Sequence, residues 1–159
     1  GIKVMSDEEK IALVDRLSKY GRVYISSEGP VPDELKDKLL KTPYHLIHHV
    51  LAFAQLVFSE GATIASEAAV LGVHALYVNT IQSGSTREQS ERYGLLYCFH
   101  DPDERFRQAA DKAVELLETP HLVEMGQAKR RKLLEEKVDI NGYFMQEMDR
   151  LAKVGRKGK

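Results

Sequence analysis

Three short apolar runs without polar alternation constrain the fold of this chain most strongly. They occupy residues Leu56–Phe58, Ala75–Val78 and Leu95–Phe99, and segments with helical spacing lie between them. A strand that is apolar on both faces is typical of a sheet covered by helices on both sides. Such strands, alternating with helices, predict an α/β fold with a parallel, Rossmann-like sheet and right-handed crossovers.

Helix signals surround these runs. The capping box Ser6–Glu9 predicts a helix start, because its serine and glutamate side chains each bond a backbone amide of the other residue. Asp101 predicts a second start as the N-cap, with Pro102 at the first helical position and Glu104 at the third. Further helical stretches are expected at residues 33–40, 45–54, 63–71, 86–93, 122–137 and 143–154, and a short β-rich run at 22–26.

The character of the sequence changes along the chain and suggests three parts. Residues 1–119 read as one α/β domain, residues 120–154 as C-terminal helices that extend it, and residues 155–159 as a flexible basic tail. Residues 129–132 form a basic cluster, but a helix spreads four consecutive residues around its circumference. We therefore expect a solvated helix at this cluster rather than a phosphate or RNA site.

Composition narrows the classes of protein to which the chain can belong. Its 159 residues carry 23 basic and 24 acidic side chains, and 43% are hydrophobic. This balance argues against disorder and against a basic surface for nucleic acid. The one cysteine, Cys98, cannot form an internal disulfide, and no apolar run approaches the roughly 18 residues of a membrane span. We expect a soluble, cytoplasmic protein.

The turn after the first apolar run carries the strongest functional signal. Gly61 and Ala62 are small residues in the turn between the predicted strand and the next helix. This turn lies at the edge where open α/β sheets bind ligands. Backbone amides at such a helix start can approach an anion closely and favour phosphate. Glu67 lies further along the same helix, where its carboxylate can accept hydrogen bonds from a ribose diol. A solvated helix residue is an equally supported interpretation of Glu67.

The segment Gly61-Ala62-Thr63-Ile64-Ala65-Ser66-Glu67, followed by Leu71-Gly72 and the predicted strand Ala75–Val78, resembles a known signature. It is the nucleotide-sugar signature in the C-terminal domain of glycosyltransferase-B-fold proteins. The segment is similar to that of the UDP-N-acetylglucosamine 2-epimerases and of the N-acetylglucosaminyltransferase of peptidoglycan lipid synthesis. The resemblance implies the C-terminal half of a glycosyltransferase-B fold, with helices on both faces of the sheet.

Three further stretches resemble one uncharacterised prokaryotic family of that superfamily. They are the His48–Ala54 helix, the Glu60–Thr63 turn and the Glu88–Leu95 stretch, and the resemblance runs from about residue 6 to residue 103. Two departures stand out: His74 occupies a position where the pattern usually has proline, and Glu60 places a negative charge beside the diphosphate site.

The resemblance implies a role for each matching residue. Gly61, Ala62 and Thr63 would hold the diphosphate of a UDP-sugar, and Glu67 its ribose. Glu88 and Gln89 match residues that contact the donor sugar. The turn at Ser27, Glu28 and Gly29 would face the cleft, and the stretch from His45 to His48 would lie near the uracil ring.

The resemblance also implies what this chain lacks. In this superfamily the active site lies between two domains, so we expect no catalytic residue, no cofactor and no turnover in this chain alone. A complete domain of the superfamily begins with a strand ahead of its first helix, and Ile2–Met5 is short for a central strand of about five or six residues. We therefore expect a missing N-terminal domain and first strand, with a rearranged sheet edge near Val23 or a partner chain covering the gap.

Alternative interpretations remain for the other reactive residues. His45, His48 and His49 have spacings that could hold zinc on one helix face, but no cysteine or glutamate completes a ligand pattern, so packing is favoured and no metal is expected. Cys98 lies in an apolar strand and reads as an inert buried thiol. The loop 83–86 is either a lid over the sugar or a simple connection.

Two functions from different classes therefore stand side by side. The first is the UDP-sugar-binding half of a glycosyltransferase or a sugar-nucleotide epimerase, inactive alone. The alternative is a non-enzymatic α/β module that binds a protein partner in a polysaccharide-assembly system. Homo-oligomerisation is left open by the sequence.

Overall fold

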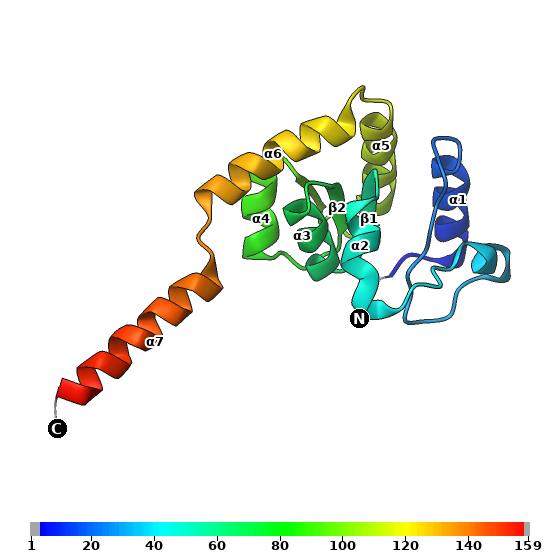
Figure 1. Ribbon diagram of the computed structural model, residues 1–159. Coiled ribbons are helices and arrows are strands. Elements are labelled where there is room, and N and C mark those ends of the chain that lie inside the picture. Colours follow the sequence, from blue (N-terminus) through cyan, green and yellow to red (C-terminus); the bar gives the residue numbers. More distant parts are fainter. Residues whose placement is uncertain (1–3, 158–159) are drawn as a thin grey trace.

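The computed structural model describes residues 4–157 and shows an α/β chain built on one parallel sheet (Figure 1). Its strands are β1 (Leu56–Ser59), β2 (His74–Val78) and β3 (Leu96–Phe99), in the order β1-β2-β3. Val57 pairs with Ala75, which pairs in turn with Leu96. The three predicted strands and their parallel arrangement are confirmed.

Helices cover both faces of this sheet. Successive side chains of β2 point to opposite faces, so each face contributes side chains to a core of its own. α3 (Ala62–Val70) and α4 (Gly84–Glu91) lie on one face, where Ala75 and Tyr77 join the core. α5 (Arg105–Leu117) covers the other face, where Leu76 and Val78 join a second core. Every side chain of β2 is buried, which explains why its sequence shows no alternation.

The first helix, α1 (Asp7–Leu17), begins at the predicted capping box. The Glu9 amide donates to the Ser6 hydroxyl at 3.2 Å, and the Ser6 amide donates to the Glu9 carboxylate at 2.8 Å. An ion pair of 2.7 Å between Arg16 and Asp111 joins α1 to α5. α1 therefore belongs to the α5 face of the sheet, and its side chains Leu13 and Leu17 pack against the second core.

The segment between α1 and α2 (Ile47–Ala52) differs from the expectation of a strand at residues 22–26. A single parallel bridge joins Ile25 to Leu39, and the Ile25 amide donates to the Lys38 carbonyl at 2.9 Å. Within residues 4–157, β1 forms an edge of the sheet, and the β-rich run does not pair with it. Gly1–Lys3 lie outside the described residues, and neither Val4 nor Met5 belongs to a strand.

Two of the helices expected in this segment are wholly or partly 3₁₀ helices. They are η1 (Asp33–Lys38), in place of a helix at 33–40, and η2 (Tyr44–Leu46), which leads into α2. Each follows a proline, Pro32 or Pro43, and neither has a side-chain cap among the described residues. Short uncapped turns favour the tighter 3₁₀ form, and η1 is held in place by the buried side chain of Leu35.

The start of α5 lies slightly later than the sequence predicts. The Asp101 carboxylate accepts hydrogen bonds from the amides of Asp103 and Glu104 at 2.9 and 2.7 Å, as an N-cap does. These bonds lower the pKa of Asp101. They close a turn at residues 102–104, and the regular helix begins at Arg105.

The helix α6 (Leu122–Glu136) lies across the α3 side of the sheet rather than in solvent. Its side chains bond to three backbone carbonyls: Gln127 to Leu71 at 3.1 Å, Lys129 to Gly94 at 2.8 Å and Arg130 to Val70 at 2.9 Å. The expectation of a wholly solvated basic cluster is therefore wrong for Lys129 and Arg130. Their cationic groups satisfy carbonyls that a helix end and a turn leave without partners.

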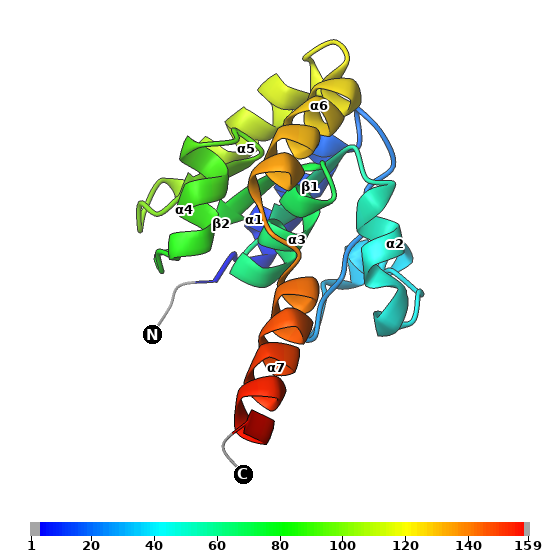
Figure 2. The same cartoon turned by 60° about the vertical axis from the view of Figure 1, so that its left-hand side comes forward.

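The last helix, α7 (Ile140–Lys157), extends away from the sheet and its covering helices (Figure 2). The sequence placed a helix end at residue 154 and a frayed tail after it, whereas α7 continues through Lys157. Residues 158–159 of that tail lie outside the described residues. No helix within residues 4–157 combines the length and apolarity that a membrane crossing needs.

Candidate functional site

The turn from β1 into α3 is short, open and held by one serine. The Ser59 hydroxyl accepts a hydrogen bond from the Gly61 amide and donates one to the Gly61 carbonyl, both at 3.0 Å. Gly61 is the N-cap of α3, and no described side chain caps this helix. A Cβ at Gly61 would meet only the Ser59 hydroxyl, at an ordinary 3.6 Å. The backbone amides of Ala62 and Thr63, the first two residues of α3, therefore have no capping side chain and can donate hydrogen bonds to a ligand.

Glu60 faces away from this helix start. Its carboxylate accepts a hydrogen bond from the backbone amide of Met5 at 3.3 Å, on the α1 side of the turn. Its backbone carbonyl accepts a hydrogen bond from the Asn79 side chain at 2.9 Å, which ties the β1 turn to the end of β2. The negative charge that departs from the sequence pattern is therefore engaged elsewhere.

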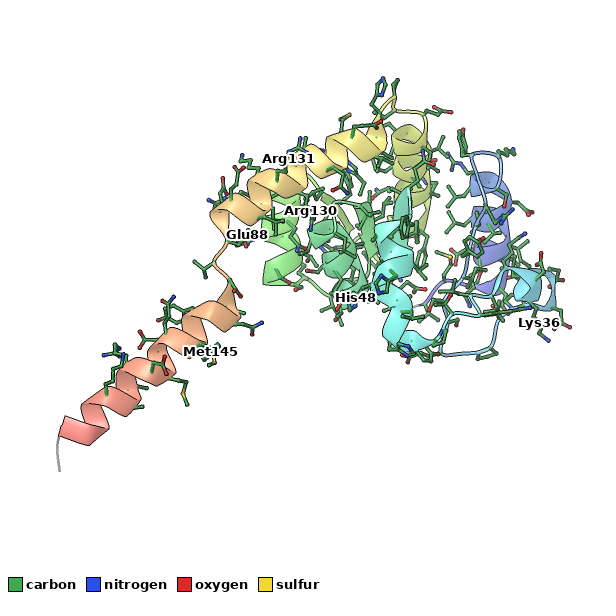
Figure 3. All side chains as sticks on the ribbon, viewed as in Figure 1. Lys36, His48, Glu88, Arg130, Arg131 and Met145 are labelled. Carbon is green, nitrogen blue, oxygen red and sulfur yellow. The ribbon has the colours of Figure 1, made fainter. Side chains whose placement is uncertain are left out.

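Glu67 and His48, two residues singled out from the sequence, come together. Nε2 of His48 lies 3.2 Å from Oε2 of Glu67, and their side chains are 56% and 35% exposed. The contact joins α2 to α3, and Figure 3 shows His48 on α2. Glu67 is therefore neither a freely solvated residue nor a buried one: its carboxylate is oriented by a neighbour and remains open to solvent.

A pocket of about 250 Å³ lies beside α2 and takes in the segment around Ser27. Ser27 shapes a turn, since its hydroxyl accepts from the Gly29 amide at 3.2 Å. Pro43, Tyr44 and Ile47 also line the pocket, and the Tyr44 side chain is 73% exposed. Ile47 immediately precedes His48, so the pocket adjoins the contact between His48 and Glu67. Tyr44 is not singled out by the sequence, although it directly precedes His45.

Glu88 and Gln89 are engaged in contacts of α4 with other parts of the chain. The Glu88 carboxylate pairs with Lys137 at 2.7 Å and with Arg92 at 3.7 Å, and the hydrogen bond raises the pKa of Lys137. Gln89 is buried, and its amide donates to the Ser66 carbonyl of α3 at 3.3 Å. Figure 3 shows Glu88 beside the end of α6, well separated from His48.

A larger pocket, of about 430 Å³, lies between α4 and the end of β3. Arg87 and His100 line it together with Ser83, Gly84 and Cys98. Nδ1 of His100 donates to the Asn79 carbonyl at 2.5 Å, which fixes the ring at the carboxyl edge of the sheet. Neither Arg87 nor His100 is singled out by the sequence, although the position of His100 directly after β3 is a usable signal; Arg87 lies in α4, the helix that follows β2.

The loop and thiol at this pocket are better defined than the sequence suggested. Residues 84–86 of the expected loop belong to α4, with Ser83 as the N-cap. The Cys98 thiol lies 3.8 Å from the Thr86 carbonyl, and burial raises its pKa, as expected of an unreactive thiol.

His74 is buried beneath α6. It is 1% exposed, and its Nδ1 lies 3.3 Å from the Tyr97 hydroxyl. Burial, and then the charge of Lys129, lower its pKa to about 4, so the ring is neutral at pH 7. A Cβ at Gly126 would collide with the carbonyl oxygen of Gly72, so α6 lies directly on the residues before β2. Among residues 4–157 no three histidine, cysteine, aspartate or glutamate side chains gather as metal ligands do.

Comparison with known proteins adds a distant structural likeness. No protein-family model and no curated protein matches the chain. A solved structure, described as that of the glycotransferase of kitacinnamycin, aligns with a TM-score of 0.49 and 16% sequence identity. The alignment covers 84% of this chain and 37% of that one, so the chain spans well under half the length of the protein it resembles.

Proposed function

We propose that this chain binds a UDP-sugar at the carboxyl edge of β1, where α3 begins. The observation that carries the proposal is the carboxylate of Glu67, which His48 orients and which lies on the helix whose start has no side-chain cap among the described residues. The sequence resemblance around Gly61–Glu67 supports the same ligand class. Three of the four parts of such a ligand, the diphosphate, the ribose and the base, each have a region that suits them.

The start of α3 suits the diphosphate. The amides of Ala62 and Thr63 open a helix that no described side chain caps, and helix starts favour anions by roughly 0.3 to 1 kcal/mol, or about 2 when partly buried. The Glu60 carboxylate is held by the Met5 amide rather than by the amides that open α3, so these amides stay available to a phosphate.

Glu67 suits the ribose diol. It lies five residues after Ala62, roughly 7 to 8 Å along the helix at about 1.5 Å per residue, which is close to the span from a diphosphate to its ribose. A carboxylate can accept a hydrogen bond from each hydroxyl of a diol, and bonds to a charged group contribute about 1.5 to 3 kcal/mol each. His48, which already contacts Glu67, keeps the carboxylate in position.

The pocket beside α2 suits the base. Its volume of about 250 Å³ exceeds that of a pyrimidine ring, and the exposed Tyr44 ring provides a surface on which a base can stack. Ser27 lies in the same pocket, in agreement with its proposed place at the cleft. His48 then lies between the base and the ribose.

The donor sugar is the part that requires rearrangement. For Glu88 to reach it, the ion pair with Lys137 has to open, and Gln89 has to leave its bond to the Ser66 carbonyl. The ligand therefore gains most of its affinity from the nucleotide. We expect a Kd of about 0.1 to 5 mM for the chain alone, or about −3 to −5.5 kcal/mol.

The wider role that we propose is the nucleotide-sugar half of a glycosyltransferase or an epimerase of the cytoplasm. Its catalytic groups would come from a second α/β domain, so this chain alone would not turn over a substrate. A non-enzymatic interaction module remains the second candidate, because α7 exposes large apolar side chains away from the proposed site.

A titration followed by amide chemical shifts tests the proposal. UDP-N-acetylglucosamine should move the amide signals of residues 61–67 and of His48, and UMP should move the turn signals less because it lacks the second phosphate. Unchanged signals at this turn at several millimolar of UDP-N-acetylglucosamine would refute the proposal. Shifts confined to the pocket of Arg87 and His100 would place the ligand elsewhere.

A further inference from the structure

The helix α7 carries an apolar stripe that the rest of the described chain leaves exposed. Ile140, Phe144, Met148 and Leu151 follow one another at helical spacing and are 54%, 60%, 63% and 56% exposed. Figures 1 and 2 both show α7 projecting from the body of the molecule. A helix with such a stripe is stabilised chiefly by packing against something else.

We propose that this stripe pairs with the same stripe of a second copy of the chain, in an antiparallel two-helix interface. The area available agrees with such an interface. Large side chains that are a little more than half exposed offer on the order of 100 Å² each, and the neighbouring Tyr143 and Met145 add to the four stripe residues. One chain thus presents roughly 600 Å², approaching the about 800 Å² per partner of a stable interface.

The charges beside the stripe favour the antiparallel arrangement. Glu147 and Arg150 lie on the same flank of the stripe, and they form an ion pair of 2.8 Å within the helix. In antiparallel helices equal flanks face each other, whereas in parallel helices opposite flanks do. The opposite flank of α7 carries the uncharged residues Asn141, Met145 and Ala152. Only the antiparallel arrangement therefore gives Glu147 a charged partner in the second copy.

A twofold axis near Met148 satisfies both requirements. It places Phe144 opposite the partner's Leu151, brings the two Met148 side chains together, and sets Glu147 beside the partner's Arg150. A twofold interface uses the same patch on both copies, so each of these contacts occurs twice. The second copy is favoured over a lipid surface because the flank beside the stripe carries an acid and a base, Glu147 and Arg150, that complement each other across the twofold axis.

Sedimentation velocity on the full chain tests the interface. We expect a dimer at about 100 µM chain, and a monomer for Phe144→Ser/Met148→Ser at the same concentration. Val123→Ser, which removes an apolar side chain that is 49% exposed on α6, is the matched control and should leave the dimer intact. Circular dichroism should show that both variants remain folded. A wild-type chain that stays monomeric would overturn the proposal.

Charge reversal tests the orientation. Glu147→Arg makes the facing flanks repel, so it should weaken the antiparallel dimer on the order of tenfold, and Glu147→Arg/Arg150→Glu should restore it. A dimer that none of these changes affects would contradict the antiparallel arrangement. A monomer that floats with vesicles of phosphatidylglycerol would assign the stripe to a lipid surface and reject the second copy.

Discussion

Nε2 of His48 lies 3.2 Å from Oε2 of Glu67, and this contact joins two helices whose residues are separated by the whole of β1. The imidazole orients the carboxylate of Glu67, which lies five residues after Ala62, the first residue of α3. Both side chains remain partly exposed to solvent, so a ligand can reach the Glu67 carboxylate while the contact with His48 stays in place. This arrangement turns an acidic residue on a helix surface into an oriented acceptor.

Removal of the imidazole should weaken nucleotide binding without destroying the fold. His48→Ala leaves Glu67 free to rotate, and the loss of this orienting contact between two partly exposed side chains corresponds to up to about 1 kcal/mol, or up to roughly fivefold in Kd for UDP. His49→Ala is the matched control, because His49 is exposed on the same helix. Isothermal titration of UDP into both variants measures the difference, and equal Kd values would remove His48 from the site.

Acid should destabilise the chain through His74. The folded state holds this histidine neutral, with a pKa near 4 against an ordinary 6.5, because burial disfavours the charged ring. The unfolded state therefore binds the proton first, and the free energy of unfolding falls as the pH drops from about 6.5 to 4, by up to about 3 kcal/mol. Urea unfolding at pH 7.5 and pH 4.5 measures this loss.

Two variants, His74→Phe and His121→Gln, test whether His74 causes this pH dependence of the free energy of unfolding. The first variant removes the buried titrating group and should flatten the pH dependence over this range. The second removes an exposed histidine and should leave the pH dependence unchanged. A pH dependence that survives in His74→Phe would show that another group is responsible.

Gly126→Ala should destabilise the packing of α6. Its Cβ would collide with the backbone carbonyl of Gly72, which cannot move as a flexible side chain does. We expect a loss of about 2 to 4 kcal/mol in the free energy of unfolding. Gly84→Ala is the control, since a Cβ at Gly84 meets open space. If the urea midpoints of the two variants agree, the close approach of α6 to Gly72 is not a determinant of stability.

The parts of the fold that follow from local sequence could be predicted. The capping box of Ser6 needs only residues three apart, and β1, β2 and β3 show apolar runs because helices cover both faces. The run at residues 22–26 has the same local character but forms only the bridge between Ile25 and Leu39 and does not join the sheet. A β-strand forms only when its backbone hydrogen-bonds to a neighbouring strand, and the sequence of one segment does not show which segment that neighbour is.

The candidate site shows the same division between local and distant information. The turn at Gly61 and the position of Glu67 on its helix follow from spacing alone. The ion pair of Glu88 with Lys137 joins residues 49 positions apart, and the carbonyl contacts of Lys129 and Arg130 depend on where α6 crosses α3. These long-range contacts decide which polar residues face solvent, and the sequence pattern does not contain them.

The most direct test of the account compares UDP-N-acetylglucosamine binding by the wild-type chain and by Glu67→Gln, which keeps the size of the side chain but removes its charge. Glu124→Gln, an exposed change on α6, serves as the control. We expect Glu67→Gln to weaken binding about 10- to 100-fold and Glu124→Gln to leave it unchanged, since bonds to a charged acceptor contribute about 1.5 to 3 kcal/mol. Equal affinity of Glu67→Gln and wild type would contradict this expectation.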